Sequence, residues 1–392
     1  FYGTGGVPNG TPNTVLTAGT GEAARGSRFG EAVATVGDVD GDGIDDLMVG
    51  ASSYNFRTEK SKAGGAFVFS GSPTGLNVVP DWSEFGEAAN TYFGASVASA
   101  GDVNGDGISD AIVGAPGYRG VGAAYVYFGS VSGLVTETAH VVSGTSASGY
   151  GRAVAGLGDV DKDGYDDVVV GAPLYDRDRH NPDDNAGAVL LYNGSEGGIG
   201  LTANWMLTGD HTGAQFGTAV AGIGDVNGDG YPDLAIGAPG YDADLLDTEA
   251  NAHGLVQVYY GGEDGLGNTP DWSYVGPEAK SRLGVSLSGG DVNGDGYADL
   301  AVGMPSIWNP DGGSTVDAPE AVLVFLGSAT GLARFPAWRL AAVQTTTDYG
   351  FSVGIVSDLQ ANAYADVLVG APHYQRQDKK PFGMAFLYAG GE

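Results

Sequence analysis

One short pattern in this chain brings four oxygen-bearing side chains into a single turn, and it occurs five times. In Asp102–Asp110, DVNGDGISD, aspartate or asparagine stands at positions 1, 3, 5 and 9, and glycine stands at position 6. Glycine permits a sharp turn, so the four side chains and the carbonyl of position 7 can converge on one point. Oxygen ligands without histidine or cysteine favour calcium over zinc or copper. No glutamate follows at position 12, so the pattern resembles only the first part of an EF-hand loop.

A metal-free set of Asp-Gly turns is the alternative interpretation of this pattern. Carboxylates packed so closely would repel one another unless a cation neutralised them, which favours calcium. Five calcium ions would reduce the formal net charge of −31 by ten units. The sequence shows no open coordination position facing a pocket, so the expected sites are structural rather than catalytic. A sixth copy has Gln360 and Asn362 at positions 3 and 5 and Ala363 in place of glycine, and we expect it to stay empty.

The elements that position these turns form a repeat. The first aspartates stand at positions 38, 102, 159, 225, 291 and 358, and a glycine lies eight residues before each, or seven in the copy at 291, preceded by an aromatic residue in all but one copy. An alternating apolar stretch such as GAFVFSG or AAYVYFG follows every copy, and another apolar stretch precedes the next glycine marker. Each unit therefore predicts four short strands joined by Gly- and Asp-rich turns, with no helical period. Repeated four-stranded units of this length are typical of a β-propeller.

The predicted fold is all-β: a six-bladed propeller of four-stranded antiparallel blades, forming a single domain over residues 1–392. The stretch NTVLTAG, which begins at Asn13, is expected to supply the fourth strand of the last blade and so to close the ring. A seven-bladed propeller is the alternative, because FYGTGG at the start resembles a leftover strand end. The chain begins at Phe1 rather than Met, as a processed or trimmed product would.

Composition excludes several classes of partner. The chain has 48 acidic and only 17 basic residues, which argues against nucleic acid and against an anionic membrane surface. It contains no cysteine, so disulfides and thiol chemistry are excluded. No apolar run approaches the ~20 residues of a membrane span, so direct membrane insertion is not expected.

The Phe-Gly marker, the Asp-rich loop and the Gly-Ala-Pro that follows it together resemble FG-GAP repeats. Such repeats build the head of integrin α chains and many bacterial surface and secreted proteins, although the integrin head resembles a ring of seven units and this chain has six. The resemblance implies about five bound calcium ions, an extracellular or cell-surface location and a role in adhesion. It implies five ligands in each loop, and the residue at position 7, named fourth in each set, contributes its backbone carbonyl. The sets are Asp38, Asp40, Asp42, Ile44 and Asp46; Asp102, Asn104, Asp106, Ile108 and Asp110; Asp159, Asp161, Asp163, Tyr165 and Asp167; Asp225, Asn227, Asp229, Tyr231 and Asp233; Asp291, Asn293, Asp295, Tyr297 and Asp299.

Loops on the opposite face are expected to bind the partner, because those between the second and third strands differ greatly from unit to unit. Four of the chain's six lysines lie in two of these loops, in the first and sixth units, and would form a basic edge facing an anionic protein or glycan. The candidate partner-binding residues are Arg57, Lys60, Lys62, Trp308, Arg376, Lys379 and Lys380. Three alternatives stay open: the charges only keep the surface soluble, the chain is a polysaccharide lyase or hydrolase, or it is a structural spacer.

Overall fold

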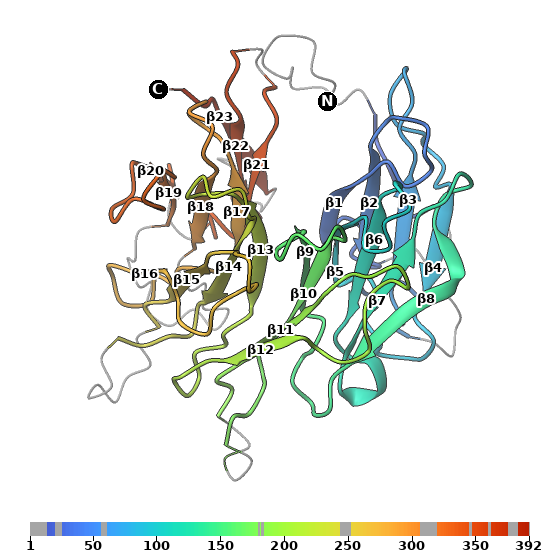
Figure 1. Ribbon diagram of the computed structural model, residues 1–392, viewed down its shortest axis with the longest axis horizontal. Helices are drawn as coiled ribbons and strands as arrows, with labels where there is room; N and C mark the ends of the chain where they lie inside the picture. Colours follow the sequence, from blue (N-terminus) through green and yellow to red (C-terminus); the bar gives the residue numbers. More distant parts are fainter. Residues whose placement is uncertain are drawn as a thin grey trace. The chain divides into compact units, whose positions relative to one another are not determined.

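The computed structural model describes residues 14–19, 26–55, 61–178, 181, 184–243, 252–305, 320–344, 347–359, 362–374 and 383–391. Within these ranges the regular elements are β-strands and one short 3-10 helix, η2 (Tyr118–Gly120) (Figure 1). The chain divides into two compact units, with the first three sheets in one and the last three in the other. That the two units together form a single domain stays a prediction.

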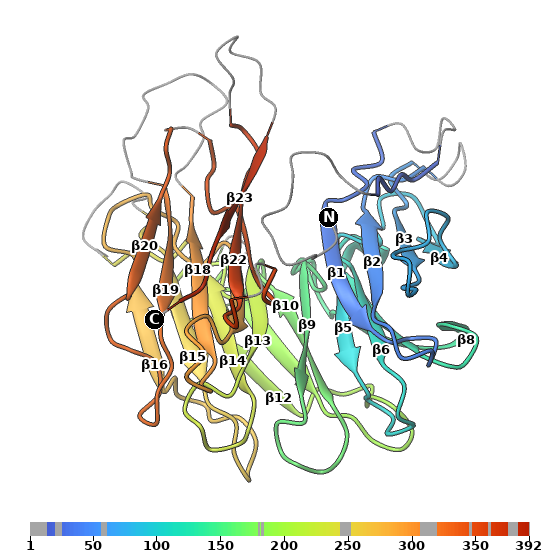
Figure 2. The same cartoon turned by 90° about the horizontal axis from the view of Figure 1, so that it is seen from above.

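The first unit contains three four-stranded sheets, and in each sheet every strand pairs antiparallel with the next along the chain. Their strands are β1 (Ala32–Gly37), β2 (Asp46–Ala51), β3 (Gly65–Phe69) and β4 (Trp82–Phe85); β5 (Ser96–Gly101), β6 (Asp110–Ala115), β7 (Ala123–Phe128) and β8 (Val135–Ser143); β9 (Ala153–Gly158), β10 (Asp167–Ala172), β11 (Ala188–Tyr192) and β12 (Trp205–Thr208). Figures 1 and 2 show β1, β5 and β9 as neighbours in this unit.

The second unit repeats the arrangement with two four-stranded sheets and one sheet in which three strands are described. Their strands are β13 (Ala219–Gly224), β14 (Asp233–Ala238), β15 (Leu255–Tyr259) and β16 (Trp272–Val275); β17 (Leu287–Gly290), β18 (Asp299–Met304), β19 (Ala321–Phe325) and β20 (Trp338–Ala341); β21 (Ser352–Val356), β22 (Asp366–Ala371) and β23 (Met384–Tyr388). The prediction of an all-β propeller with six blades is confirmed, and the seven-bladed alternative is not supported by the described strands.

Each unit buries its apolar residues between successive sheets. One cluster joins Met48 and Val68 of the first sheet to Val113 and Tyr125 of the second. Equivalent clusters join the second sheet to the third, the fourth to the fifth, and the fifth to the sixth. Because both faces of an inner strand are covered, the second strand of a sheet is a continuous apolar run, and all six residues of β6 are buried.

The glycine markers allow successive sheets to approach closely. A Cβ added to Gly114, in the Gly-Ala-Pro of the second sheet, would lie 2.1 Å from the carbonyl oxygen of Gly151, the marker glycine of the third. The same contact recurs between Gly50 and Gly94. Since no other residue lacks a Cβ, this contact requires glycine at position 114. The marker glycine is required separately, because Gly151 has φ of 81° and its Cβ would lie 2.1 Å from the carbonyl oxygen of Ala123.

The tryptophans and tyrosines that recur in phase with the repeat pack within or between sheets. Trp82 of β4 meets Tyr127 of the next sheet edge to face at a centroid distance of 5.0 Å, and Trp272 meets Phe325 in the same way. Tyr54 packs on Phe67 of its own sheet at a centroid distance of 5.5 Å. These rings stabilise the blades by packing.

The predicted closing strand stays a prediction. It would pair residues of the first unit with β23, which belongs to the second unit. Within the first unit, Leu16 packs against a buried cluster of the first sheet that contains Val49, Phe67 and Phe69. Asn13 lies outside the described residues.

Candidate metal sites

The Asp-rich pattern forms the turn between the first and second strands of each sheet, as predicted. In the first turn, both oxygens of Asp38 accept backbone N–H bonds: Oδ1 from Asp42 at 3.0 Å and Oδ2 from Gly43 at 2.7 Å. The other four turns repeat these bonds. The glycine at position 6 has φ between 87° and 96° in all five turns, which explains why glycine stands there.

Carboxylates converge in two of these turns. In the first, Asp38, Asp40 and Asp42 each offer an oxygen within 4.8 Å of the others. In the third, Asp159, Asp161 and the buried Asp167 do the same. Such a cluster of hard oxygens fits a divalent cation such as calcium, which would neutralise charges that otherwise repel one another.

The aspartate at position 9 makes two backbone hydrogen bonds that the sequence did not indicate. Asp46 is 0% exposed; its Oδ2 accepts the backbone N–H of Val39 at 3.0 Å, and its Oδ1 accepts that of Gly71 at 2.8 Å. The same two bonds recur in all six sheets, so this carboxylate ties the turn to the end of the third strand. Each oxygen retains a lone pair that could also face a cation.

Burial strongly affects the protonation of these aspartates. It raises the pKa of Asp110, Asp167 and Asp233 to about 7, and that of Asp299 to about 6. The two backbone hydrogen bonds to each carboxylate oppose this effect, whereas the neighbouring carboxylates of the turn add to it. A bound cation would supply the missing counter-charge.

Neighbouring turns are linked within each unit. The backbone N–H of Ser109 in the second turn donates to the carbonyl of Asp38 in the first at 3.1 Å, and Asp166 donates to Asp102 at 3.0 Å. A Cβ on Gly105 would lie 2.7 Å from the ring of Tyr165, so the residue at position 7 also packs on the preceding turn. Successive turns of one unit are therefore in direct contact.

The sixth turn keeps the backbone hydrogen bonds to its first aspartate but lacks the carboxylates of positions 3 and 5. Asp358 accepts the N–H groups of Asn362 and Ala363, and Ala363 has φ of 73°, a conformation that a residue with a Cβ adopts only under strain. Position 5 is an amide, and Gln360 at position 3 lies outside the described residues. That this turn stays empty remains a prediction.

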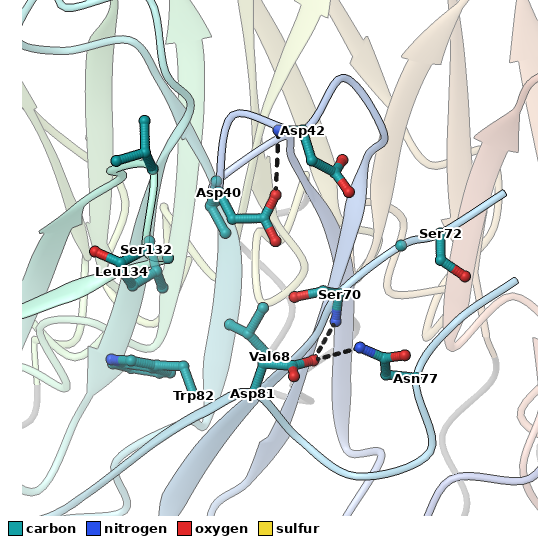
Figure 3. Close-up of a pocket in the computed structure, with 14 residues that line it drawn as sticks. Asp40, Asp42, Val68, Ser70, Ser72, Asn77, Asp81, Trp82, Ser132 and Leu134 are labelled. Carbon is teal, nitrogen blue, oxygen red and sulfur yellow. Dashed lines mark hydrogen bonds between the residues drawn. The ribbon is translucent and has the colours of Figure 1, made fainter.

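A cavity of about 620 Å³ adjoins the first turn, although the sequence showed no such pocket (Figure 3). Asp40 and Asp42 line one side, and Trp82, Ser132 and Leu134 line others. The cavity lies beside Ser70, the residue after β3. At the equivalent position the second and fourth sheets carry an aromatic residue, whose ring contacts the next sheet. A small residue at this point therefore leaves the space open.

Hydrogen bonds fix one wall of this cavity. Oδ2 of Asp81 accepts the backbone N–H of Ser70 at 3.1 Å and Nδ2 of Asn77 at 3.0 Å, as the dashed lines in Figure 3 show. Burial raises the pKa of Asp81, but these bonds outweigh it and lower the pKa on balance. Asp81 therefore stays ionised and holds the connection between β3 and β4 in place.

The five intact turns are expected to differ in affinity. At positions 1, 3, 5 and 9 the turns at Asp38 and Asp159 carry four aspartates, whereas the other three carry three aspartates and one asparagine. More ligand charge favours the ion, so Asp42→Ala should remove a site at least as tight as the one that Asp106→Ala removes. Calcium titration of the two variants against the parent measures this order. A sixth ion bound at Asp358 would contradict the expectation for the last turn.

Most of the predicted partner-binding residues lie outside the described residues: Arg57, Lys60, Trp308, Arg376, Lys379 and Lys380. Lys62 is described; it lies in the connection between β2 and β3, and its backbone N–H donates to Oδ1 of Asn55 at 2.8 Å. In the described part of the chain, no helix is long and apolar enough to cross a membrane.

Repeated four-stranded sheets, with an Asp-rich turn between the first two strands, define a propeller built from one sequence repeat. The FG-GAP repeat family model matches residues 29–69, 93–127, 150–192, 216–260 and 283–314, which together make up half of the chain. The chain therefore belongs to the FG-GAP repeat family.

Three similar proteins are integrin α chains. Integrin alpha-4 of Xenopus laevis is 36% identical over 188 residues, covering 46% of this chain and 17% of the relative. Integrin alpha-5 of Xenopus laevis is 34% identical over 236 residues, and integrin alpha-V of Gallus gallus is 33% identical over 232; each match covers 56% of this chain and 21% of the relative. The chain thus spans about a fifth of the length of these relatives.

Proposed function

We propose that this chain is a calcium-stabilised adhesion propeller that acts outside the cell or at its surface. The observation that carries this proposal is the turn that recurs at the same place in successive sheets, with carboxylates clustered in the first and third turns. Membership of the FG-GAP family and similarity to integrin α chains support the same conclusion. Calcium would act structurally, by neutralising the turn and fixing the connection between the first two strands.

The proposed ligand set in each turn is the one the sequence predicts. The side chains at positions 1, 3 and 5 and the carbonyl of position 7 come from the turn itself. The aspartate at position 9 adds an oxygen while it holds the turn to the third strand. About five ions are proposed, one for each intact turn.

The partner is proposed to be a protein that binds the face opposite the calcium turns. Similarity to integrin alpha-4 and integrin alpha-5 supports a protein partner, because integrins are adhesion receptors. Because successive strands of a sheet run antiparallel, the second strand ends and the third begins at the opposite end of the sheet from the Asp-rich turn. An enzyme or a spacer remains the alternative, and turnover of polysaccharides would be the result that favours an enzyme.

The basic edge can be tested by joint replacement of Lys60, Lys62, Lys379 and Lys380 with alanine. If the edge binds an acidic partner, affinity for an acidic polysaccharide or acidic protein patch should fall about tenfold or more, and should also weaken with added salt. The matched control is Lys162→Ala with Lys280→Ala, which removes the two remaining lysines. Equal binding by parent and quadruple variant would assign these charges to solubility alone.

A further inference from the structure

A side chain from outside the third turn reaches into its carboxylate cluster. Asn193 is the first residue after β11, and its backbone N–H donates to Oδ1 of Asn204 at 3.0 Å. Its side-chain Nδ2 lies 2.5 Å from Oδ2 of Asp161, one of the three clustered carboxylates. Its amide oxygen Oδ1 is buried and has no hydrogen-bond partner.

A buried amide oxygen without a partner is uncommon in folded proteins and calls for an explanation. Oδ1 and Nδ2 are bonded to the same carbon, and Nδ2 contacts the carboxylate cluster. Oδ1 is therefore separated from the cluster by no more than the size of one amide group. The two ends of an amide occupy nearly the same volume, and a half turn of the group exchanges them. Without a cation, the N–H end must face Asp161, because an oxygen there would be repelled.

We propose that Asn193 is a ligand of the cation in the third turn and presents Oδ1 to it. This inference rests on the proposed calcium site. An amide oxygen is a hard, neutral ligand of the kind that calcium accepts beside carboxylates. Without the cation, Nδ2 of the amide donates to Asp161. With the cation bound by Asp161, the amide would turn so that Oδ1 faces the ion.

Comparison with the other sheets supports this assignment. In the fourth and fifth turns position 3 is an asparagine, and Nδ2 of Asn227 donates to Asp229 at 2.8 Å within the turn itself. In the third turn position 3 is Asp161, and the amide comes from Asn193 instead. The residue equivalent to Asn193 is Phe128, Tyr260 and Leu326 in the three sheets whose turns carry asparagine at position 3. Those residues can supply no oxygen ligand from their side chains, apart from the hydroxyl of Tyr260, which accepts the N–H of Leu332.

The extra ligand would distinguish the third turn from the second, fourth and fifth. Calcium accepts six to eight oxygens in a flexible arrangement, whereas magnesium requires a near-octahedral set and keeps several waters. An additional protein oxygen therefore favours calcium over magnesium at this turn. The Asn193-Gly194-Ser195 sequence also matches a glycosylation acceptor, but a side chain turned into the carboxylate cluster is not available for a glycan.

A crystal structure of the parent protein grown with calcium tests the inference directly. An ion in the third turn with Oδ1 of Asn193 at about 2.3–2.6 Å is the expected result. An ion in that turn with Oδ1 more than about 3.5 Å away would overturn the inference and leave the proposed function intact. Calcium in none of the five turns would overturn the proposed function itself.

Calcium and magnesium titrations of three variants provide a second test. Asn193→Ala should weaken calcium binding at one site by about 10- to 100-fold and bring its calcium and magnesium affinities closer together. Asn193→Asp keeps an oxygen and loses the N–H, so it should bind calcium at least as tightly as the parent. Asn268→Ala, at an exposed asparagine in the connection between β15 and β16, is the matched control and should leave all sites unchanged. If Asn193→Asp weakens binding as much as Asn193→Ala, the amide serves only as a hydrogen-bond donor to Asp161.

Discussion

Removal of calcium is expected to lower the melting temperature of each unit by about 10 °C. Calcium that binds only the folded turns stabilises them by mass action, by about 1.4 kcal/mol per turn at ten times the dissociation constant. The first unit holds three of the five intact turns and the second holds two. The free energy of unfolding should therefore fall by about 4 kcal/mol in the first unit and about 3 kcal/mol in the second.

Scanning calorimetry with excess calcium and after chelation measures this change. Adding calcium back to the chelated protein should restore the original transition, which separates loss of the ion from irreversible damage. Metal analysis must show that the chelated sample contains no calcium. An unchanged transition in such a sample would rule out a stabilising role for the ion. A larger shift for the transition of the second unit would contradict the distribution of sites.

Asp366→Ala is expected to destabilise the second unit by roughly 2–6 kcal/mol, although its turn is not expected to bind calcium. Asp366 is 0% exposed and accepts the backbone N–H groups of Leu359 at 3.0 Å and Gly390 at 3.2 Å. Alanine leaves both donors without an acceptor, and each buried, unpaired N–H costs about 1–3 kcal/mol. Urea unfolding, followed by the signal of the second unit, measures the loss.

Two comparisons separate this structural role from metal binding. The loss caused by Asp366→Ala should be the same with calcium and with chelator, whereas Asp233→Ala should cost more in calcium than in chelator because it removes a ligand as well. Asp264→Ala, on an exposed turn of the same unit, serves as a surface control. Its free energy of unfolding should stay within about 0.5 kcal/mol of that of the parent. Equal stability of Asp366→Ala and Asp264→Ala would show that the two backbone bonds contribute nothing.

The sequence predicted the repeat, the strands and the turns well because their signals are local. The pattern in Asp102–Asp110 spans nine residues, so its spacing alone places the side chains on one side of a turn. The second strands are continuous apolar runs, and the close contact of Gly114 with Gly151 explains why the glycines recur in phase. Such features depend on backbone geometry within one unit or between successive units, and each repeat gives the same signal again.

The closing strand has no such local signal. A short apolar stretch near the N-terminus can be buried by any neighbouring sheet, and its composition does not say which one. Leu16 packs on the first sheet, a contact that the spacing of the repeat does not indicate. Pairing of this stretch with β23, hundreds of residues away, stays a prediction, because no local pattern encodes it.

By itself the sequence determined the class of fold, the number of repeats and the positions of the carboxylates, since all of these follow from short-range periodicity. Only the tertiary structure showed that the position-9 aspartate is tied to a backbone N–H about 25 residues away, as Asp46 is to Gly71. Only the tertiary structure brought Asn193 to Asp161 and opened the cavity beside Ser70. These contacts depend on which residue follows the third strand and on the register between strands, so they form only when the sheet has assembled.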